Sequence, residues 1–225
     1  MNVLVAIVLL LALCSPLVSW WAGWVLRRHE AERSDLPGTG GDLARHLVER
    51  FGLVGVIVEP AAAGGHYDPA ALAVRLDPAL LNGRSLAAAV VAAHEVGHAL
   101  QHREGCRLFS LRQHLARAEA VLGTIGKLGV WGLLGASVML GAPSLGVAAI
   151  ALGIAGWLVS VLFHLATLPV EWDASFTRAL PVLREYLSAE DMPVARDILR
   201  ACALTYLGAA LVSLSSLRRW LLPAR

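Results

Sequence analysis

Two histidines and a glutamate stand close together in the segment His94-Glu95-Val96-Gly97-His98. Residues four apart lie on one face of an α-helix, with Cβ atoms about 5–6 Å apart, so both imidazoles can converge on one metal ion. Glu95 lies beside them and is placed to act through a water, first as general base and then as proton donor to a leaving amine. The segment therefore predicts a zinc site that hydrolyses amide bonds, with His94 and His98 as ligands and Glu95 as the catalytic residue.

The third zinc ligand has three candidates in the sequence. His102 continues the stripe of the two histidines, but it lies about 12 Å from His94 along the helix axis, whereas ligands reach zinc within about 2.0–2.2 Å. We therefore expect His102 to be structural or at the rim of the site. Glu104 stands where a longer zinc-binding pattern has its last histidine, but the glycine that turns the chain in that pattern is absent. Glu171, on a separate helix, completes a two-His one-Glu set and is the preferred candidate.

Capping and turn residues predict the elements that hold these side chains. Ser85 is a good N-cap, and the alanine-rich run from Leu86 to His102 favours a helix that Gly105 ends. Pro169 suits the first turn of a second helix, which carries Glu171. The metal site is therefore expected where two helices meet.

A small domain is predicted before the first of these helices. Residues 34–41 are typical of a linker, and a short amphipathic helix is expected from Asp42 to Gly52. Strands are predicted at Val54–Val58 and Ala73–Leu76, and the segment His66-Tyr67-Asp68-Pro69 between them is expected to enter a turn. This pattern indicates an α+β domain with a small sheet.

Much of the remaining chain is apolar enough for a membrane protein. Hydrophobic residues make up 57% of the sequence, and the mean hydropathy is +0.63. The segment Val3–Leu26 is uncharged and long enough to cross a bilayer, and it lacks the features of a cleaved signal peptide, so a retained anchor is expected. Between Ala120 and Val170, a turn at residues 141–144 divides an apolar stretch into the two spans of a transmembrane hairpin. Residues 201–217 are a candidate fourth span.

Charge indicates the orientation and argues against one class of partner. Arg27 and Arg28 follow the first span and no basic residue precedes it, so the positive-inside rule places residues 27 onward in the cytoplasm. The net charge is only +2 and the basic residues form no dense run, so no nucleic-acid partner is expected. The three cysteines are far apart, which indicates neither a disulfide framework nor a thiolate metal site.

Taken together, these motifs resemble the YugP-type neutral zinc metallopeptidases, bacterial membrane proteins distantly similar to HtpX-like and CAAX-processing proteases. The resemblance covers nearly the whole chain. It rests on the N-terminal span, the hairpin and four segments: His66-Tyr67-Asp68-Pro69, Val74-Arg75-Leu76, Ala92-Ala93-His94-Glu95-Val96-Gly97-His98-Ala99, and Leu168-Pro169-Val170-Glu171 with Ala174-Ser175. The resemblance implies zinc held by His94, His98 and Glu171, catalysis by Glu95, and a site that faces the cytoplasm at the surface of the bacterial cell membrane.

Two positions depart from the family pattern. HtpX-like relatives carry Asp four residues after the third ligand, where this chain has Ser175, and Gly65 stands where YugP-type sequences often have Asp. Ligand histidines usually donate their second ring N–H to a carboxylate, carbonyl or water. Ser175 and the nearby carboxylates of Asp173 and Asp68 are therefore the candidates for orienting a ligand histidine.

Four further polar residues have two interpretations each. His66 and Tyr67 can donate hydrogen bonds to developing negative charge, so they are candidates for oxyanion stabilisation or substrate binding. The simpler interpretation is a turn with two solvent-facing aromatic groups. In the hairpin, His164 is seven residues before Glu171 and hence on a similar helix face, but it is expected to pack against a neighbouring span, and Lys127 to reach the surface or face the bundle interior.

We thus predict a mainly α membrane protein, with transmembrane helices and a cytoplasmic zincin-like α+β metallopeptidase domain that contains a small sheet. Its expected segments are an anchor at 1–27, a zincin-like domain at 28–119, a hairpin at 120–168, cytoplasmic helices with the third ligand at 169–200, and an apolar helix at 201–225.

The predicted activity is a zinc-dependent endopeptidase that cuts membrane-associated or misfolded polypeptides at the lipid bilayer. The alternative is a non-catalytic membrane protein, either an inactive protease-like scaffold or a metal-handling protein. Glu95 separates the two, because metal handling needs no carboxylate that stays off the metal. A proton-coupled transporter that uses Lys127 and His164 has thinner support, with one such group per span.

Overall fold

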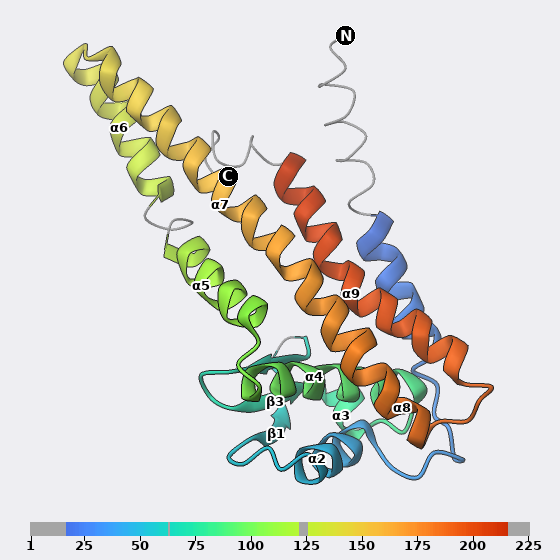
Figure 1. Ribbon diagram of the computed structural model, residues 1–225. Coiled ribbons are helices and arrows are strands. Elements are labelled where there is room, and N and C mark those ends of the chain that lie inside the picture. The colour runs from blue at the N-terminus through green and yellow to red at the C-terminus, as the bar shows by residue number, and fades with distance from the viewer. Residues whose placement is uncertain (1–16, 63, 122–125, 216–225) are drawn as a thin grey trace. The chain divides into compact units, whose positions relative to one another are not determined.

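The computed structural model describes residues 17–62, 64–121 and 126–215, and it is mainly helical with one three-stranded sheet (Figure 1). The chain forms two compact units. The larger unit contains Val18–Ser110 and Leu168–Thr205, and the smaller unit contains Leu111–Thr167 together with residues at both ends of the chain. The predicted content of helices with a small sheet is confirmed, whereas the predicted domain boundaries remain a prediction.

The larger unit begins with helical residues 18–28. Its other elements, in chain order, are α2 (Gly40–Arg50), β1 (Ile57–Pro60), β2 (His66–Asp68), β3 (Ala73–Leu76), α3 (Pro78–Asn82), α4 (Leu86–Arg103), η2 (Asp173–Ala179) and α8 (Leu180–Tyr186). Three helices continue from one unit into the other, namely α5 (Arg107–Val121), α7 (Pro143–Trp172) and α9 (Met192–Ser215).

The central element of the larger unit is α4. The Ser85 hydroxyl accepts a hydrogen bond from the Ala88 backbone N–H at 3.1 Å, which caps the first turn. All residues from Leu86 to Gln101 are buried, so this alanine-rich helix is enclosed by its neighbours on every side. Gly105 follows the helix with a φ of +65°, a conformation that glycine adopts without steric cost. The predicted helix over residues 86–102 is confirmed.

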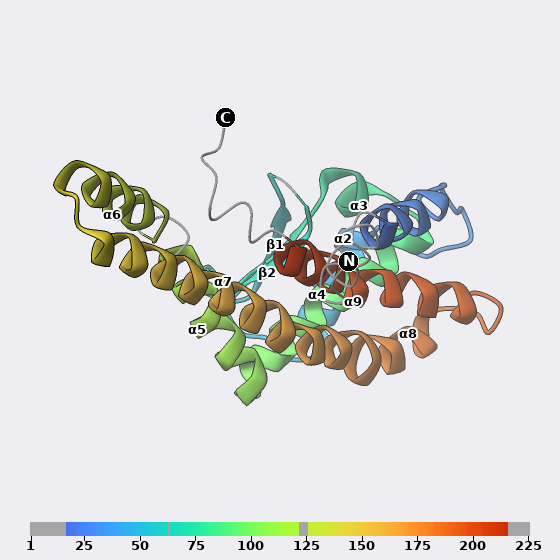
Figure 2. The same cartoon turned by 90° about the horizontal axis from the view of Figure 1, so that it is seen from above.

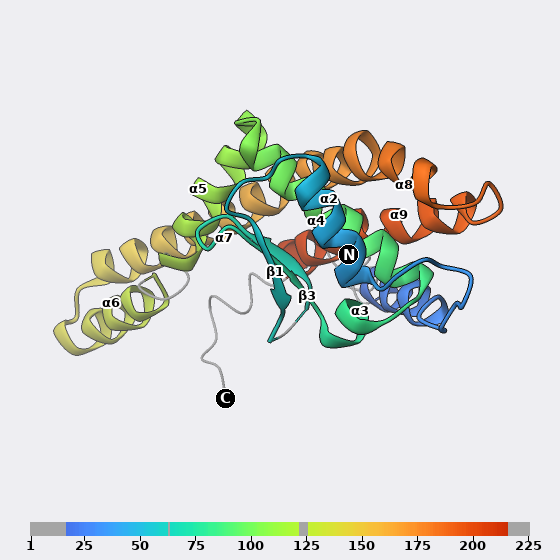
Figure 3. The ribbon, with the colours of Figure 1, turned by 90° about the horizontal axis from the view of Figure 1, so that it is seen from below.

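The short helix α2 packs against α4, and Figure 3 shows the two crossing when the molecule is seen from below. Thr39 caps α2 and exchanges hydrogen bonds with Asp42, which forms a capping box. The helix begins at Gly40, two residues earlier than predicted. A Cβ at Gly40 would lie 2.5 Å from the Leu80 carbonyl oxygen, so only glycine allows this close approach.

The sheet has the strand order β1-β3-β2, in which β3 pairs in parallel with β1 and antiparallel with β2. The predicted strand Ala73–Leu76 is confirmed. The strand predicted at Val54–Val58 begins instead at Ile57, because Gly52 and Gly55 take positive φ values of +58° and +82° and form a turn before it. The segment His66-Tyr67-Asp68-Pro69, predicted to enter a turn, forms the strand β2 up to Asp68, and the chain turns from Pro69 onward.

The smaller unit contains α6 (Lys127–Leu140), which lies beside α7, as Figures 1 and 2 both show. Gly141 links them in the left-handed conformation, with a φ of +61°. Within this unit, the Ser160 hydroxyl donates to a Glu119 carboxylate oxygen at 2.6 Å. In the described part of the chain, one helical run, Pro143–Tyr186, is long and apolar enough to cross a membrane, and α6 provides a shorter apolar helix.

The helix expected to begin at Pro169 in fact begins at Pro143, and Pro169 lies inside it. This prediction was wrong because proline at a helix start and proline inside a longer helix look alike in sequence. Immediately after α7 the chain forms the π-helix η2 and then α8 without a break. Residues 1–16 of the predicted anchor and residues 216–217 of the predicted fourth span lie outside the described residues, and the candidate fourth span continues a helix that starts at Met192.

Candidate metal centre

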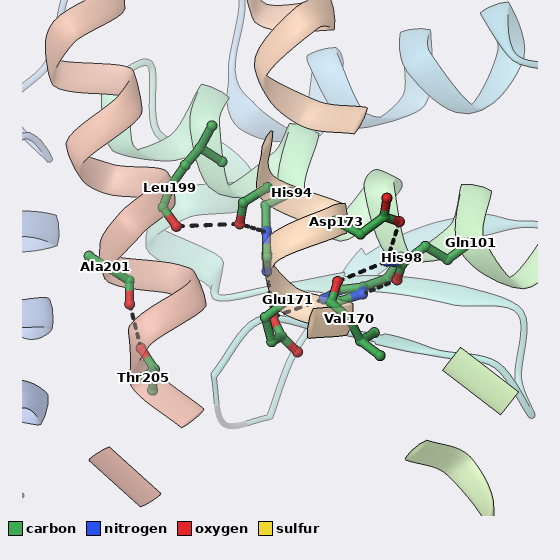
Figure 4. Close-up of polar contacts among 10 residues, drawn as sticks. His94, His98, Gln101, Val170, Glu171, Asp173, Leu199, Ala201 and Thr205 are labelled. Carbon is green, nitrogen blue, oxygen red and sulfur yellow. Dashed lines mark hydrogen bonds and ion pairs between the residues drawn. The ribbon is translucent and has the colours of Figure 1, made fainter. Parts of the chain in front are cut away.

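Three donor atoms from two helices converge inside the larger unit. Nε2 of His94 and Nε2 of His98 each lie 3.2 Å from Oε2 of Glu171 (Figure 4). The ligand atoms of the three residues all lie within 4.8 Å of one another. The side chains are also deeply buried, with His94 and His98 each 4% exposed and Glu171 1% exposed. Of the three candidates for the third ligand, the structure therefore brings Glu171 to the histidine pair.

The close crossing of α4 and η2 makes this convergence possible. His94 and His98 are one turn apart on α4, and Glu171 is the penultimate residue of α7. Gly97 lies between the histidines in sequence, and a Cβ there would stand 2.8 Å from the Ala174 carbonyl oxygen. The absence of a side chain at residue 97 thus allows the second helix to approach.

Both imidazoles are also held from behind, at Nδ1. His94 Nδ1 lies 3.1 Å from the Ser175 hydroxyl, which donates its own proton to the Leu199 carbonyl oxygen at 3.3 Å. His98 Nδ1 lies 2.9 Å from Oε1 of Gln101. These contacts turn both Nε2 atoms toward Glu171. Ser175 was predicted as a group that orients a ligand histidine. Gln101 was not, because the sequence showed only that it replaces the glycine of the longer zinc-binding pattern.

The electrostatics of the centre favour an ionised carboxylate. Burial opposes ionisation of Glu171, but the electrostatic attraction of His98 and hydrogen bonds from both imidazoles outweigh it and hold the pKa of this carboxyl well below its usual range. A buried carboxylate that stays ionised is a suitable ligand for a divalent cation.

The donor set fits zinc. Two imidazole nitrogens and a carboxylate oxygen are the protein ligands of one common class of catalytic zinc site. With ligand distances of about 2.0–2.1 Å, two ligands of a tetrahedral zinc are about 3.3 Å apart. The separations of 3.2 Å between each Nε2 and Oε2 match that edge. The donor chemistry and both histidine–glutamate separations therefore fit the ion.

Glu95 follows His94 on α4 and is 6% exposed. A Cβ placed on Gly65, just before β2, would lie 3.9 Å from Oε1 of Glu95. The departure from the family pattern at this position thus borders the predicted catalytic carboxylate.

Other residues singled out in the sequence lie around the centre. His66 is exposed on β2, and its Nδ1 is 3.2 Å from the Gly64 carbonyl oxygen. Tyr67 is buried, with its hydroxyl 2.9 Å from Nδ1 of His102. Burial and, to a smaller extent, the Asp68 carboxylate raise the pKa of Tyr67, so its hydroxyl stays protonated at neutral pH.

The remaining acidic candidates bind arginines. Asp68 accepts from Arg75 at 2.6 Å and from backbone N–H groups of the following turn, so the structure places it away from the supporting contacts of both histidines. Glu104 pairs with Arg178 at 2.8 Å. Asp173 also binds Arg178, and it accepts a hydrogen bond from Gln101, which in turn contacts His98.

The fold and this donor set define a helical metalloprotein whose metal site has the ligands of a zinc hydrolase. Residues 3–225 match the protein family described as "Putative neutral zinc metallopeptidase". A relative from Bacillus subtilis (strain 168), named "Putative membrane protease YugP", is 34% identical over 212 residues, which cover 91% of each chain. No solved structure matches the chain significantly.

The chain therefore belongs to the neutral zinc metallopeptidase family, as the sequence motifs indicated. Its metal cofactor is zinc, and the buried cluster of His94, His98 and Glu171 is suited to hold it.

Proposed function

We propose that the chain is a membrane-embedded zinc endopeptidase with His94, His98 and Glu171 as ligands and Glu95 as general base, in the manner of the gluzincins. The observation that supports this most strongly is the convergence of two Nε2 atoms on one buried carboxylate, with Glu95 in the same helical turn. Glu95 lies next to the ligand His94 in sequence but is not part of the cluster of three proposed ligands. A site that only stored metal would not need such an additional carboxylate.

Glu95 performs the proton transfers of the proposed reaction. Its carboxylate accepts a proton from the attacking water and returns it to the leaving amine. Zinc, when bound, polarises the scissile carbonyl and lowers the pKa of a water to about 7. The enclosed position of Glu95 keeps bulk water from competing for its proton.

In this proposal, the substrate-binding residues are His66 and Tyr67 on β2. His66 is exposed on an edge strand of the sheet, so its side chain and backbone are available to a polypeptide. The protonated hydroxyl of Tyr67 is a hydrogen-bond donor one strand position further on, and it is paired with His102 in the absence of substrate. We propose that these groups bind substrate or stabilise the oxyanion.

The proposed location is a bacterial cell membrane, with the active site facing the cytoplasm. The long apolar run Pro143–Tyr186 and the word "membrane" in the relative's name support membrane association. Because Glu171 lies on this same helical run, the site is expected near the bilayer surface, which favours membrane-associated polypeptides as substrates.

The deciding experiment is Glu95→Gln in the full-length protein, purified in detergent. We expect unchanged zinc content, measured by atomic absorption, and a loss of casein or membrane-peptide cleavage of about 10²–10⁴-fold, because the proton transfer is removed. Full activity in the variant would remove Glu95 from the mechanism. Stoichiometric zinc in a wild-type protein that cleaves neither substrate would favour the metal-handling alternative.

A further inference from the structure

Gln101 is a polar side chain that is completely buried, one turn after His98 on α4. Its amide nitrogen donates two hydrogen bonds, to the Val170 carbonyl oxygen and to Oδ2 of Asp173, both at 2.8 Å. Both partners are acceptors that carry no proton. The amide nitrogen must therefore face Val170 and Asp173, and the orientation of the Gln101 amide is fixed.

The fixed amide determines the state of His98. Oε1 of Gln101 points at Nδ1 of His98 from 2.9 Å, and a carbonyl oxygen can only accept a hydrogen bond. Nδ1 must then carry a proton. When zinc replaces the proton that Nε2 shares with Glu171, the proton at Nδ1 remains, and Nε2 of the neutral imidazole offers its lone pair to the metal.

Asp173 is itself held from the outside. Its Oδ2 also accepts from Nε of Arg178 at 2.8 Å, and Nη1 of Arg178 reaches Glu104 at 2.8 Å. Arg178 thus links Glu104, just after α4, to Asp173 on η2. Asp173 in turn contacts Gln101, which contacts the imidazole of His98. Asp173 thus has a fixed position from which to accept the second hydrogen bond of the Gln101 amide.

We propose that Gln101 and Asp173 are positioning residues that hold His98 in its Nδ1–H tautomer and so raise the affinity of the site for zinc. This inference rests on the proposed role of His98 as a ligand. It differs from a packing role, in which Gln101 merely fills space between α4 and the end of α7. The two roles predict different zinc affinities for variants that keep or remove the oxygen atom facing Nδ1 of His98.

Two double variants separate these roles. In Gln101→Glu with Asp173→Asn, the polarity of the pair is reversed: the new carboxylate at position 101 still accepts from His98, and the new amide at position 173 donates to that carboxylate. In Gln101→Leu with Asp173→Asn, the volume is similar but the acceptor is lost. Both variants remove the donor to the Val170 carbonyl, and in the Glu variant a carboxylate oxygen also faces that carbonyl, a cost that works against the expected ranking.

The measurement is the zinc dissociation constant, by competition with a chromophoric chelator, on the full-length protein in detergent. We expect the Leu variant to bind zinc about 10–100-fold more weakly than the Glu variant. Equal affinities, or weaker binding by the Glu variant, would overturn the proposal in favour of packing. The melting temperature of each zinc-free variant checks that both proteins fold.

A second measurement does not depend on either variant. In wild-type protein that is labelled with ¹⁵N-histidine and loaded with zinc, Nδ1 of His98 should carry a slowly exchanging proton. The resonance is assigned by comparison with a His98→Gln sample. An Nδ1 without a proton contradicts the proposal even if the Leu variant does not fold.

Glu171→Ala distinguishes a failure of this inference from a failure of the proposed site. If this variant binds zinc as tightly as the wild type, the ligand set itself is wrong. If it loses zinc while the Glu and Leu variants bind equally well, the ligand set stands and only the positioning role of Gln101 and Asp173 is rejected.

Discussion

At the scale of single residues, the orientation of the two proposed ligand imidazoles depends on neighbouring side chains outside the proposed ligand set. Each imidazole has two nitrogens, and a buried hydrogen bond at one of them decides which is free for coordination. His94 finds this bond at Ser175 and His98 at Gln101. A neutral hydroxyl and a neutral amide thus occupy positions where a carboxylate would add a further negative charge beside Glu171.

Ser175→Ala tests the hydroxyl. Because the Ser175 hydroxyl donates to Leu199, its oxygen accepts from Nδ1 of His94, and its removal leaves that N–H without a protein acceptor. We expect zinc affinity to fall about tenfold, at the low end of the range for partners of ligand histidines, with little change in melting temperature of the zinc-free protein.

The matched control is Thr205→Val, which deletes a hydroxyl that bonds the Ala201 carbonyl oxygen on α9 (Figure 4). Zinc affinity should stay within about twofold of the wild type there. A similar loss of zinc in both variants would mean that removing any hydroxyl from this unit weakens the site, and Ser175 would have no specific role.

At the scale of elements, η2 is the feature that sequence patterns could not reveal. Ser85 and Gly105 mark the ends of α4 by local chemistry, so that helix was predictable within one residue at its C-terminal end. A π-helix has no comparable marker, although such segments are frequent at functional sites. The π-helix η2 carries Asp173 and Ser175. The sequence could suggest both residues as groups that orient a ligand histidine, but it could not show which histidine each one contacts.

The sequence also predicted Glu171 and missed Gln101, for a physical reason. Zinc needs a third protein ligand, and a carboxylate just after an apolar span stands out among the candidates for that ligand. A glutamine on a buried helix face is ambiguous until its partners are known. Those partners, Val170 and Asp173, are about seventy residues away and meet Gln101 only through tertiary packing.

Gly97→Ala tests the close crossing of α4 and η2. A Cβ would stand 2.8 Å from the Ala174 carbonyl oxygen, and backbone atoms cannot move aside as flexible side chains can. We expect overpacking to cost about 1–3 kcal/mol, against a gain of up to about 1 kcal/mol from helix propensity, so the net effect is destabilising. Zinc affinity should fall as well, because Glu171 moves away with η2.

Gly132→Ala in α6 is the control, because nothing lies within 4 Å of a Cβ at that position. Thermal unfolding and zinc titration in detergent measure both variants. Gly132→Ala should be neutral or stabilising. A Gly97→Ala protein with unchanged stability and zinc affinity would show that the crossing tolerates a wider separation than the structure indicates.

At the scale of the whole molecule, the order of the chain constrains its path through a membrane. The larger unit is built from residues on both sides of Leu111–Thr167 in sequence. Its sheet and buried polar centre need partners that a lipid interior does not supply, so this unit is expected to stay on one side of the bilayer. Both ends of the intervening segment must then lie on that same side.

If the intervening segment crosses the bilayer, this constraint requires it to return to the side from which it started. The turn at Gly141 reverses the chain between α6 and α7. With fourteen residues, α6 is about 21 Å long, which is shorter than the hydrocarbon core of about 30 Å. A complete crossing therefore needs residues before Lys127, whereas α7 is long enough by itself.

Cysteine labelling in intact cells tests this path, starting from a protein in which Cys14, Cys106 and Cys202 are replaced by alanine. Ser144 is exposed beside the turn after α6, and Asn82 is exposed at the end of α3 in the larger unit. A membrane-impermeant maleimide should label Ser144→Cys from outside the cell and should label Asn82→Cys only after the membrane is permeabilised.

If both positions react from outside, the larger unit faces outward and the positive-inside assignment fails. If neither reacts until permeabilisation, residues 111–167 do not reach the outer surface, and the hairpin dips into the bilayer or lies along it instead of crossing.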